Sequence, residues 1–299
     1  MFLVKKCERG GFSVNVTELR DGEVLLPKRA AETHKGDYGR LLILGGCVGY
    51  TGAPTLCARA AVRSGAGLVY LGVPAPIYDI TAMKNDEAMP FPLPADEAGG
   101  LSEKAVDIIE SRLQNCDVCA VGPGMGKGAG TAAAVRCVLE RFHGPVVLDA
   151  DGLNVLAGRL DWLKAHDGPV ILTPHDGEYA RLGGVIGADR AESALRFAKE
   201  HRCILVLKGH RTVVAYPTGG VYITTHGNPG MAKGGSGDVL TGVIAALLGQ
   251  LPAERAVPTA VYLHSYAGDL CANALGEYAM TANDIIGALI MATQKMIKE

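Results

Sequence analysis

The chain has 299 residues, of which 48% are hydrophobic, so it is long enough to bury a large core. Its formal net charge of -2 gives no basic surface for nucleic acid or an anionic membrane. An aromatic content of 5% argues against base-stacking platforms, and the 40 glycines gather beside apolar runs, as in tight turns.

The N-terminal segment MFLVKKCERG lacks the apolar core of a secretory signal. No uncharged apolar stretch approaches the ~18 residues that a membrane span requires. We therefore expect a soluble, cytoplasmic protein in which residues 1–30 are an irregular surface decoration. The 8 cysteines, most of them in apolar runs, fit reduced thiols, and the Cys116–Cys119 pair has no second pair at zinc spacing.

Short runs rich in Val, Ile and Leu predict buried strands, each ending in Gly, Pro, Asp or His: 41–46, 68–74, 117–124, 145–152, 169–175 and 203–209. Helical segments lie between and after them: 54–64, 102–114, 129–142, 152–157, 177–182, 189–201, 237–249, 254–274 and 281–297. This alternation predicts an α/β fold with a mostly parallel sheet and helices on both faces. Residues 212–217 and 220–225 flank a Pro-Thr-Gly-Gly turn and predict an antiparallel hairpin at the edge of the sheet.

In open α/β sheets, ligands bind beyond the carboxyl ends of the strands. The glycines and polar residues of this chain fall at those ends and predict one crevice, lined by Gly45-Gly46, Gly122–Gly126, Asp149–Asn154, Thr173–Glu178 and Lys208–Thr212. Asp149, Asp151 and Asn154 have an alternative role as caps of the following helix. Two glycine-rich segments of this crevice look like nucleotide-binding motifs but lack the required residue spacing. GGCVGYTG does not have the spacing of a dinucleotide fingerprint, and GPGMGKG does not have that of a P-loop.

The segment KGGSGDVLTG, Lys233–Gly242, precedes an apolar helical run. Gly234, Gly235 and Gly237 allow a sharp turn with exposed N–H groups at a helix start, which together favour phosphate. Asp238 in the first helical turn would repel that phosphate, so it suits a base that deprotonates a hydroxyl attacking the phosphorus. The simpler alternative is an early acid that interacts favourably with the helix dipole.

The GxGD element before an alanine-rich helix resembles the ribokinase-like superfamily of small-molecule kinases. The segments HKGDYGRLLILGG, YTGAPTLCARAAVRSGAGLV, VGPGMG, VLDADGLN, LTPHDGE, VLKGHRTVV and GNPGMAKGGSGDVLTG stand in order and narrow the match. Over roughly residues 20–295, they resemble the ADP/ATP-dependent NAD(P)H-hydrate dehydratases. This resemblance implies a ribokinase-like three-layer sandwich and one domain over residues 1–299, with no epimerase domain of the kind that precedes it in bifunctional relatives.

The resemblance also implies an activity. Family members phosphorylate the hydroxyl of hydrated NADH or NADPH with ADP or ATP, and loss of phosphate restores the coenzyme; bacterial members mostly use ADP and the S epimer. Asp238 would be the base and, with Ala53, Gly124 and His175, would bind the hydrate. The nucleotide would be bound by two groups of residues: Lys208, Gly209, His210, Arg211 and Thr212, and Gly235, Ser236 and Gly237.

Phosphoryl transfer also implies Mg²⁺, for which Glu178 is the candidate protein ligand. Where many superfamily kinases have Asn-x-x-Glu, this chain has His175-Asp176-Gly177-Glu178, which matches the dehydratases. Two alternatives stay open: a kinase of a thiazole or pyrimidine vitamin precursor, and a non-catalytic nucleotide sensor. Relatives are often tetrameric, so we also expect a homo-oligomer.

Overall fold

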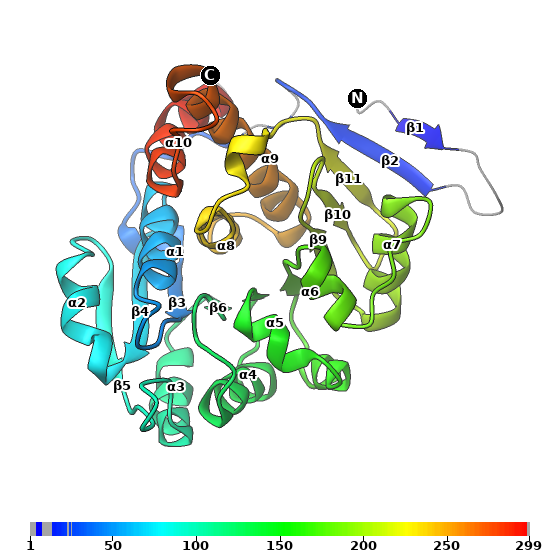
Figure 1. Ribbon diagram of the computed structural model, residues 1–299. Coiled ribbons are helices and arrows are strands. Elements are labelled where there is room, and N and C mark those ends of the chain that lie inside the picture. The colour runs from blue at the N-terminus through cyan, green and yellow to red at the C-terminus, as the bar shows by residue number, and fades with distance from the viewer. Residues whose placement is uncertain (1–3, 8–13, 23, 25, 298–299) are drawn as a thin grey trace.

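The computed structural model describes residues 4–7, 14–22, 24 and 26–297. Within them, one 11-stranded sheet has the order β1-β2-β11-β10-β9-β8-β7-β6-β3-β4-β5 (Figure 1). The strands are β1 Val4–Cys7, β2 Val14–Leu19, β3 Arg40–Leu44, β4 Leu68–Pro74, β5 Met89–Leu93, β6 Val118–Val121, β7 Val146–Leu148, β8 Val170–Leu172, β9 Ile204–Leu207, β10 Val213–Ala215 and β11 Val221–Thr224.

The strands from β9 to β5 along this order pair in parallel. Helices connect them, as parallel pairing requires. The α-helices are α1 Gly52–Arg63, α2 Tyr78–Met83, α3 Val106–Leu113, α4 Ala129–Arg141, α5 Asp151–Leu156, α6 Asp176–Arg181, α7 Arg190–His201, α8 Ser236–Leu248, α9 Ala253–Leu275 and α10 Ala282–Met296. Short 3-10 helices are η1 Lys35–Tyr38, η2 Ala75–Ile77, η3 Glu103–Ala105, η4 Leu160–Ala165 and η5 Pro229–Met231.

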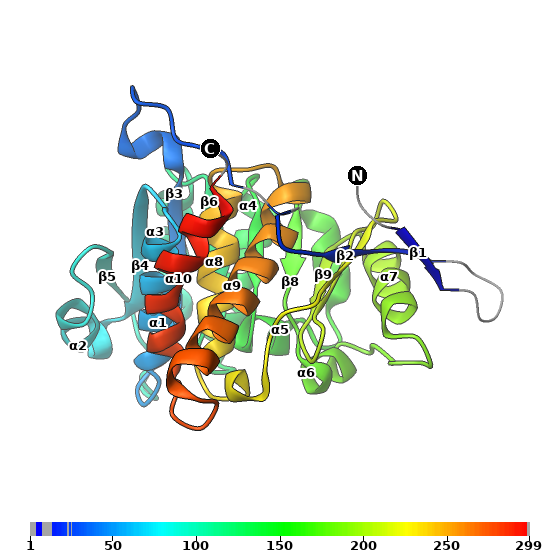
Figure 2. The same cartoon turned by 90° about the horizontal axis from the view of Figure 1, so that it is seen from above.

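Two hydrophobic cores lie on opposite faces of the sheet because successive side chains of a strand alternate. Leu41 and Ile43 of β3 pack into the core that contains α1, α8, α9 and α10. Leu42 and Leu44 pack into the core that contains α3, α4, α5 and α7. Figure 2 shows the first group of helices together on one side of the strands. The expected three-layer α/β sandwich is therefore confirmed.

The two edges of the sheet differ from the sequence predictions. β10 and β11 form the expected antiparallel hairpin, but β2 pairs in parallel with β11 and β1 pairs with β2, so two strands lie outside the hairpin. The prediction that residues 1–30 are irregular is thus wrong for β1 and β2, and residues 1–3, 8–13, 23 and 25 lie outside the described residues. The burial of Val14 and Leu19 explains why β2 is held there.

At the other edge, β5 and the preceding α2 were not predicted. The sequence of β5, MPFPL, contains two prolines, which lack the N–H group that a central strand must donate. They are accommodated because β5 is the last strand and pairs only with β4.

Among the helices of the described residues, none has the length and apolar character needed to cross a bilayer. The cysteines whose side chains are described are all free thiols, and most of them are buried.

Candidate active site

The first turn of α8 carries the glycines and the acid of the KGGSGD segment. Gly235 caps the helix in a left-handed conformation, with φ 97°, which favours glycine. A Cβ there would lie 2.6 Å from Leu56 Cδ1 of α1, so the turn also needs glycine for space. The backbone N–H groups that begin α8 therefore lie close to α1, in the arrangement by which helix starts commonly bind anions.

Lys208, at the end of β9, points its ammonium group to this helix start. A Cβ on Gly237 would lie 3.4 Å from Lys208 Nζ. The same nitrogen lies 2.7 Å from Asp149 Oδ1 and 3.7 Å from Glu178 Oε2. Burial lowers the pKa of Lys208, but the charges of Asp149 and Glu178 more than offset this and leave the pKa raised. A permanent positive charge is thus held beside the anion-binding turn.

Asp238 is half-buried in the first turn of α8. Burial, followed by the negative charges of Asp149 and Glu178, raises its pKa to about 7, whereas Lys208 acts to lower it. A carboxylate with a pKa near neutrality accepts a proton more readily than an ordinary aspartate. The structure thus gives this residue the chemical character of a general base.

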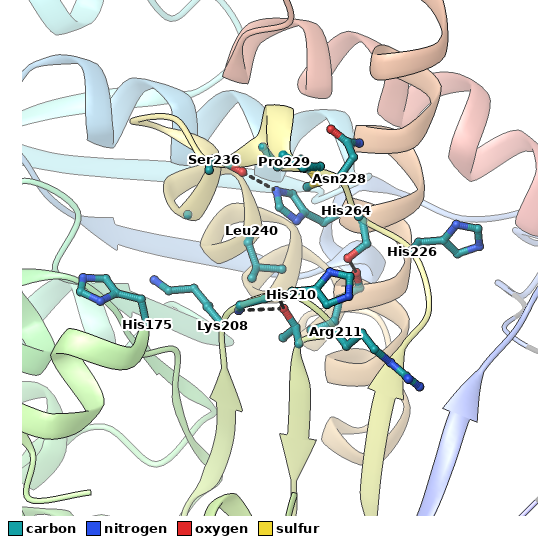
Figure 3. Close-up of a pocket in the computed structure, with 18 of the residues that line it drawn as sticks. His175, Lys208, His210, Arg211, His226, Asn228, Pro229, Ser236, Leu240 and His264 are labelled. Carbon is teal, nitrogen blue, oxygen red and sulfur yellow. Dashed lines mark hydrogen bonds between the residues drawn. The ribbon is translucent and has the colours of Figure 1, made fainter. Parts of the chain in front are cut away.

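A cavity of about 770 Å³ lies next to this helix start (Figure 3). The Lys208–Thr212 segment forms one wall, and the loop of residues 226–233 forms another. Leu240, Val261 and His264 supply the surface between them. A cavity of this size accommodates a nucleotide-sized ligand.

The Lys208–Thr212 turn is held by residues from two other elements. Arg190 of α7 donates a 2.6 Å hydrogen bond to the carbonyl oxygen of Lys208. Arg211, with φ 60°, donates to Glu18 of β2 at 2.9 Å. Figure 3 shows the Lys208 side chain directed toward His175, away from His210 and Arg211. The Arg211 side chain is thus tied to β2, and the Lys208 ammonium lies beside the start of α8.

The residues predicted for the hydrate form two groups. Gly124, after β6, adjoins Ala53 of α1, since a Cβ on Gly124 would lie 3.1 Å from that of Ala53. Neither residue lines the cavity next to α8, whereas His175 does. The His175 ring caps α6: Nδ1 accepts from the N–H groups of Gly177 and Glu178. Nε2 of the neutral ring therefore bears the proton, and the role of His175 in substrate binding stays a prediction.

The sequence assigned no catalytic role to three residues that belong to the site. Asp149 does not cap α5, because Ala150 holds the cap position; its Oδ2 instead accepts from Thr241 of α8 at 2.8 Å. His264 is buried in α9, 3.5 Å from Ser236 Oγ, and burial lowers its pKa to about 4. His226 lines the cavity, and its two ring nitrogens pair with the carboxylates of Asp21 and Asp269. The sequence could have indicated Asp149, because it is an acid directly after a predicted buried strand. It could not have indicated His264, which lies inside a helix with no motif around it.

The residues present fit a magnesium ion only in part. Over the described ranges, no group of three or more His, Cys, Asp or Glu residues is arranged to hold a metal. Glu178 is buried, and its Oε2 accepts from the backbone N–H of His175 at 2.9 Å. Magnesium commonly uses one or two carboxylates together with phosphates and water. The residues of the site therefore fit an ion that a bound nucleotide would hold in the main, and Glu178 as a metal ligand stays a prediction.

The chain is similar to proteins of known name over most of its length. The bifunctional NAD(P)H-hydrate repair enzyme of Moorella thermoacetica is 47% identical over 279 residues, which are 92% of this chain but 53% of that protein. The ADP-dependent (S)-NAD(P)H-hydrate dehydratase of Neisseria meningitidis is 36% identical, over 83% of this chain and 82% of that protein. The chain thus spans about half the length of the bifunctional relatives.

The solved structures agree. The ADP/ATP-dependent NAD(P)H-hydrate dehydratase of Bacillus subtilis, crystallised with ATP and Mg²⁺, has a TM-score of 0.80 and 32% identity, over 91% of this chain and 95% of that one. A hydroxyethylthiazole kinase from Pyrococcus horikoshii, at TM-score 0.54 and 14% identity, shares the fold alone. The family model for NAD(P)H-hydrate dehydratase matches residues 41–291. The chain therefore belongs to the NAD(P)H-hydrate dehydratase family.

Proposed function

We propose that this protein dehydrates the S epimer of hydrated NADH or NADPH, using ADP or ATP, and so restores the reduced coenzyme. The observation that carries the proposal is the half-buried carboxyl group of Asp238, with a pKa of about 7, at a phosphate-binding helix start beside a nucleotide-sized cavity. The 36% identity to the ADP-dependent (S)-NAD(P)H-hydrate dehydratase of Neisseria meningitidis supports the choice of reaction.

In the first step, the hydroxyl oxygen of the hydrated nicotinamide ring attacks the terminal phosphorus of the nucleotide. The new O–P bond forms as the bond to the leaving nucleotide breaks, so ADP becomes AMP, or ATP becomes ADP. Asp238 accepts the hydroxyl proton. The N–H groups at the start of α8 and the Lys208 ammonium stabilise the charge on the transferred group.

In the second step, the ring C–O bond breaks and phosphate departs with the bonding electrons. The neighbouring ring carbon loses a proton to water, and the electrons of that C–H bond restore the carbon–carbon double bond of the dihydropyridine. Phosphorylation is useful because phosphate is a far better leaving group than hydroxide. The nucleotide is therefore a co-substrate that is consumed at each turnover.

We place the nucleotide in the cavity between the Lys208–Thr212 turn and loop 226–233, with its terminal phosphate at Gly235–Gly237. The hydrate extends from Asp238 toward Ala53 and Gly124, where small residues allow close approach. Glu178 is the candidate protein ligand for Mg²⁺, which would neutralise phosphate charge when bound. We also propose a homo-oligomeric assembly.

The test is to incubate the purified protein with chemically prepared NADH hydrate and Mg²⁺, adding ADP or ATP in parallel reactions. We expect the absorbance of the reduced nicotinamide to return, with one AMP or ADP formed per coenzyme. A stable phosphorylated product would instead identify a conventional kinase. No recovery with either nucleotide would refute the proposal.

A further inference from the structure

We propose that Asp149 is a positioning residue for the reaction: it holds Lys208 at the first turn of α8 and sets the charge around Asp238. Asp149 directly follows β7, Lys208 directly follows β9, and Asp238 lies in the first turn of α8. The inference rests on the proposed function, because it assigns Asp238 the role of base.

The contacts of Asp149 use both of its carboxylate oxygens. Oδ1 lies 2.7 Å from Lys208 Nζ, and Oδ2 accepts a 2.8 Å hydrogen bond from Thr241 Oγ1. The residue is only 1% exposed, so the carboxylate is stabilised by these partners and not by water. Thr241 lies one helical turn after Asp238, so Asp149 joins the base-bearing helix to the lysine on the sheet.

The charge of Asp149 opposes the effect of Lys208 on the base. Asp149 raises the pKa of Asp238 and is the largest contribution after burial, whereas Lys208 lowers it. The same carboxylate forms the 2.7 Å ion pair that fixes Lys208 beside the start of α8. One buried carboxylate thus holds the lysine in place for the phosphoryl group and keeps the aspartate basic for the hydroxyl. Among the described residues, Asp149, Lys208 and Glu178 act electrostatically on Asp238, and Asp238 acts on the Cys57 thiol. His264 is in turn affected by the charge of Lys208.

The decisive variant is Asp149→Asn, which keeps the shape and removes the charge. Activity rises with pH as Asp238 ionises, so losing the nearby negative charge moves this rising limb to lower pH, by about one unit. We also expect kcat at neutral pH to fall at least 10-fold, since the base is weaker and Lys208 has lost its main partner. Lys208→Met removes the opposite charge and should move the limb to higher pH.

Thr81→Val is a matched control, because Thr81 is fully buried and hydrogen-bonded to Ile77 but lies in α2. It reports the effect of losing a buried hydrogen bond on stability and on the pH profile. A kcat loss in Asp149→Asn with an unmoved limb would show that Asp149 is merely structural and would overturn the inference.

A second measurement does not depend on turnover or on the correct substrate. Carbon-13 NMR of labelled aspartate carboxyl groups, with the Asp238 signal assigned by its loss in Asp238→Asn, gives the Asp238 pKa directly. We expect a lower pKa in Asp149→Asn and a higher one in Lys208→Met, even if the hydrate proves to be the wrong substrate. Equal values in all three proteins would refute the inference. Failure of the hydrate assay alone would refute only the proposed function.

Discussion

Asp238 combines features that conflict in a stable protein. It lies at a helix start, which favours a negative charge, yet burial and two nearby carboxylates raise its pKa to about 7. The ionised form that the proposed role as a base requires is therefore the form that the folded protein disfavours. Such a conflict between stability and activity is expected at an active site and favours the proposed base over an ordinary helix-start acid.

Replacing Asp238 by Asn should remove the proton acceptor with little change in shape. We expect kcat to fall by about 10²-fold or more, because general-base catalysis typically contributes ~10²–10⁴-fold. Nucleotide binding should be retained, since the cavity and the N–H groups of α8 remain. Steady-state kinetics and titration calorimetry with ADP measure the two quantities. Full activity in the variant would exclude Asp238 as the base.

The same substitution should stabilise the protein at alkaline pH. A carboxyl group whose pKa is raised on folding binds its proton more tightly in the folded state, so its ionisation costs stability as pH rises from about 4 through 7. The asparagine side chain of the variant cannot ionise and avoids this cost. We expect Asp238→Asn to melt roughly 2 °C or more above the wild type at pH 8, with a smaller difference at pH 5. Equal melting temperatures at both pH values would contradict the raised pKa.

At the scale of elements, the sequence predicted the parts that carry a strong local pattern. β3, β4, β6–β9 and the helices between them other than α2 follow from short apolar runs in alternation with helical segments. β5 was missed because Pro90 and Pro92 are unusual in strands. β2 was missed because its sequence, VNVTEL, is not a continuous apolar run and the strand is held by burial and by partners far along the chain. Such long-range partners are not visible in a local pattern.

Asp21 joins the segment after β2 to the cavity beside α8. Its carboxylate accepts from Tyr262 at 2.6 Å and lies 2.7 Å from Nε2 of His226, a cavity residue, and 2.9 Å from Lys295 Nζ. The hydrogen bond from Tyr262, followed by those from Lys295 and His226, lowers the pKa of Asp21, so the residue is ionised at neutral pH.

Asp21→Asn should therefore loosen loop 226–233 and raise the KM for ADP several-fold, while kcat stays within about twofold, because the variant is remote from the reacting atoms. Glu140→Gln, which breaks the exposed Arg136–Glu140 pair of α4, is the matched control and should change neither constant. Initial rates over a range of ADP concentrations measure both. An unchanged KM in Asp21→Asn would show that the interactions of Asp21 stabilise this part of the surface without positioning loop 226–233 for ADP.

At the scale of the whole molecule, the site forms where one helical layer meets the carboxyl ends of the strands. The sequence correctly placed polar residues at those ends, but it did not show which of them meet. Asp149 and Thr241 are 92 residues apart, and only the packing of α8 on the sheet brings them together. The chemistry of the site thus depends on how accurately α8 is docked between α1 and the strands.

Gly235→Ala tests this dependence. A side chain at Gly235 would require a strained φ and would meet Leu56 and Ala282, so α8 must shift away from α1 and α10. We expect a lower melting temperature together with a kcat loss of about 10-fold or more, because small misplacements of catalytic groups are costly. Gly234→Ala is the matched control, since a Cβ at Gly234 has no neighbour within 4 Å and φ there is not positive. If both variants retained the same kcat and melting temperature, docking of α8 against α1 would not determine the geometry of the site.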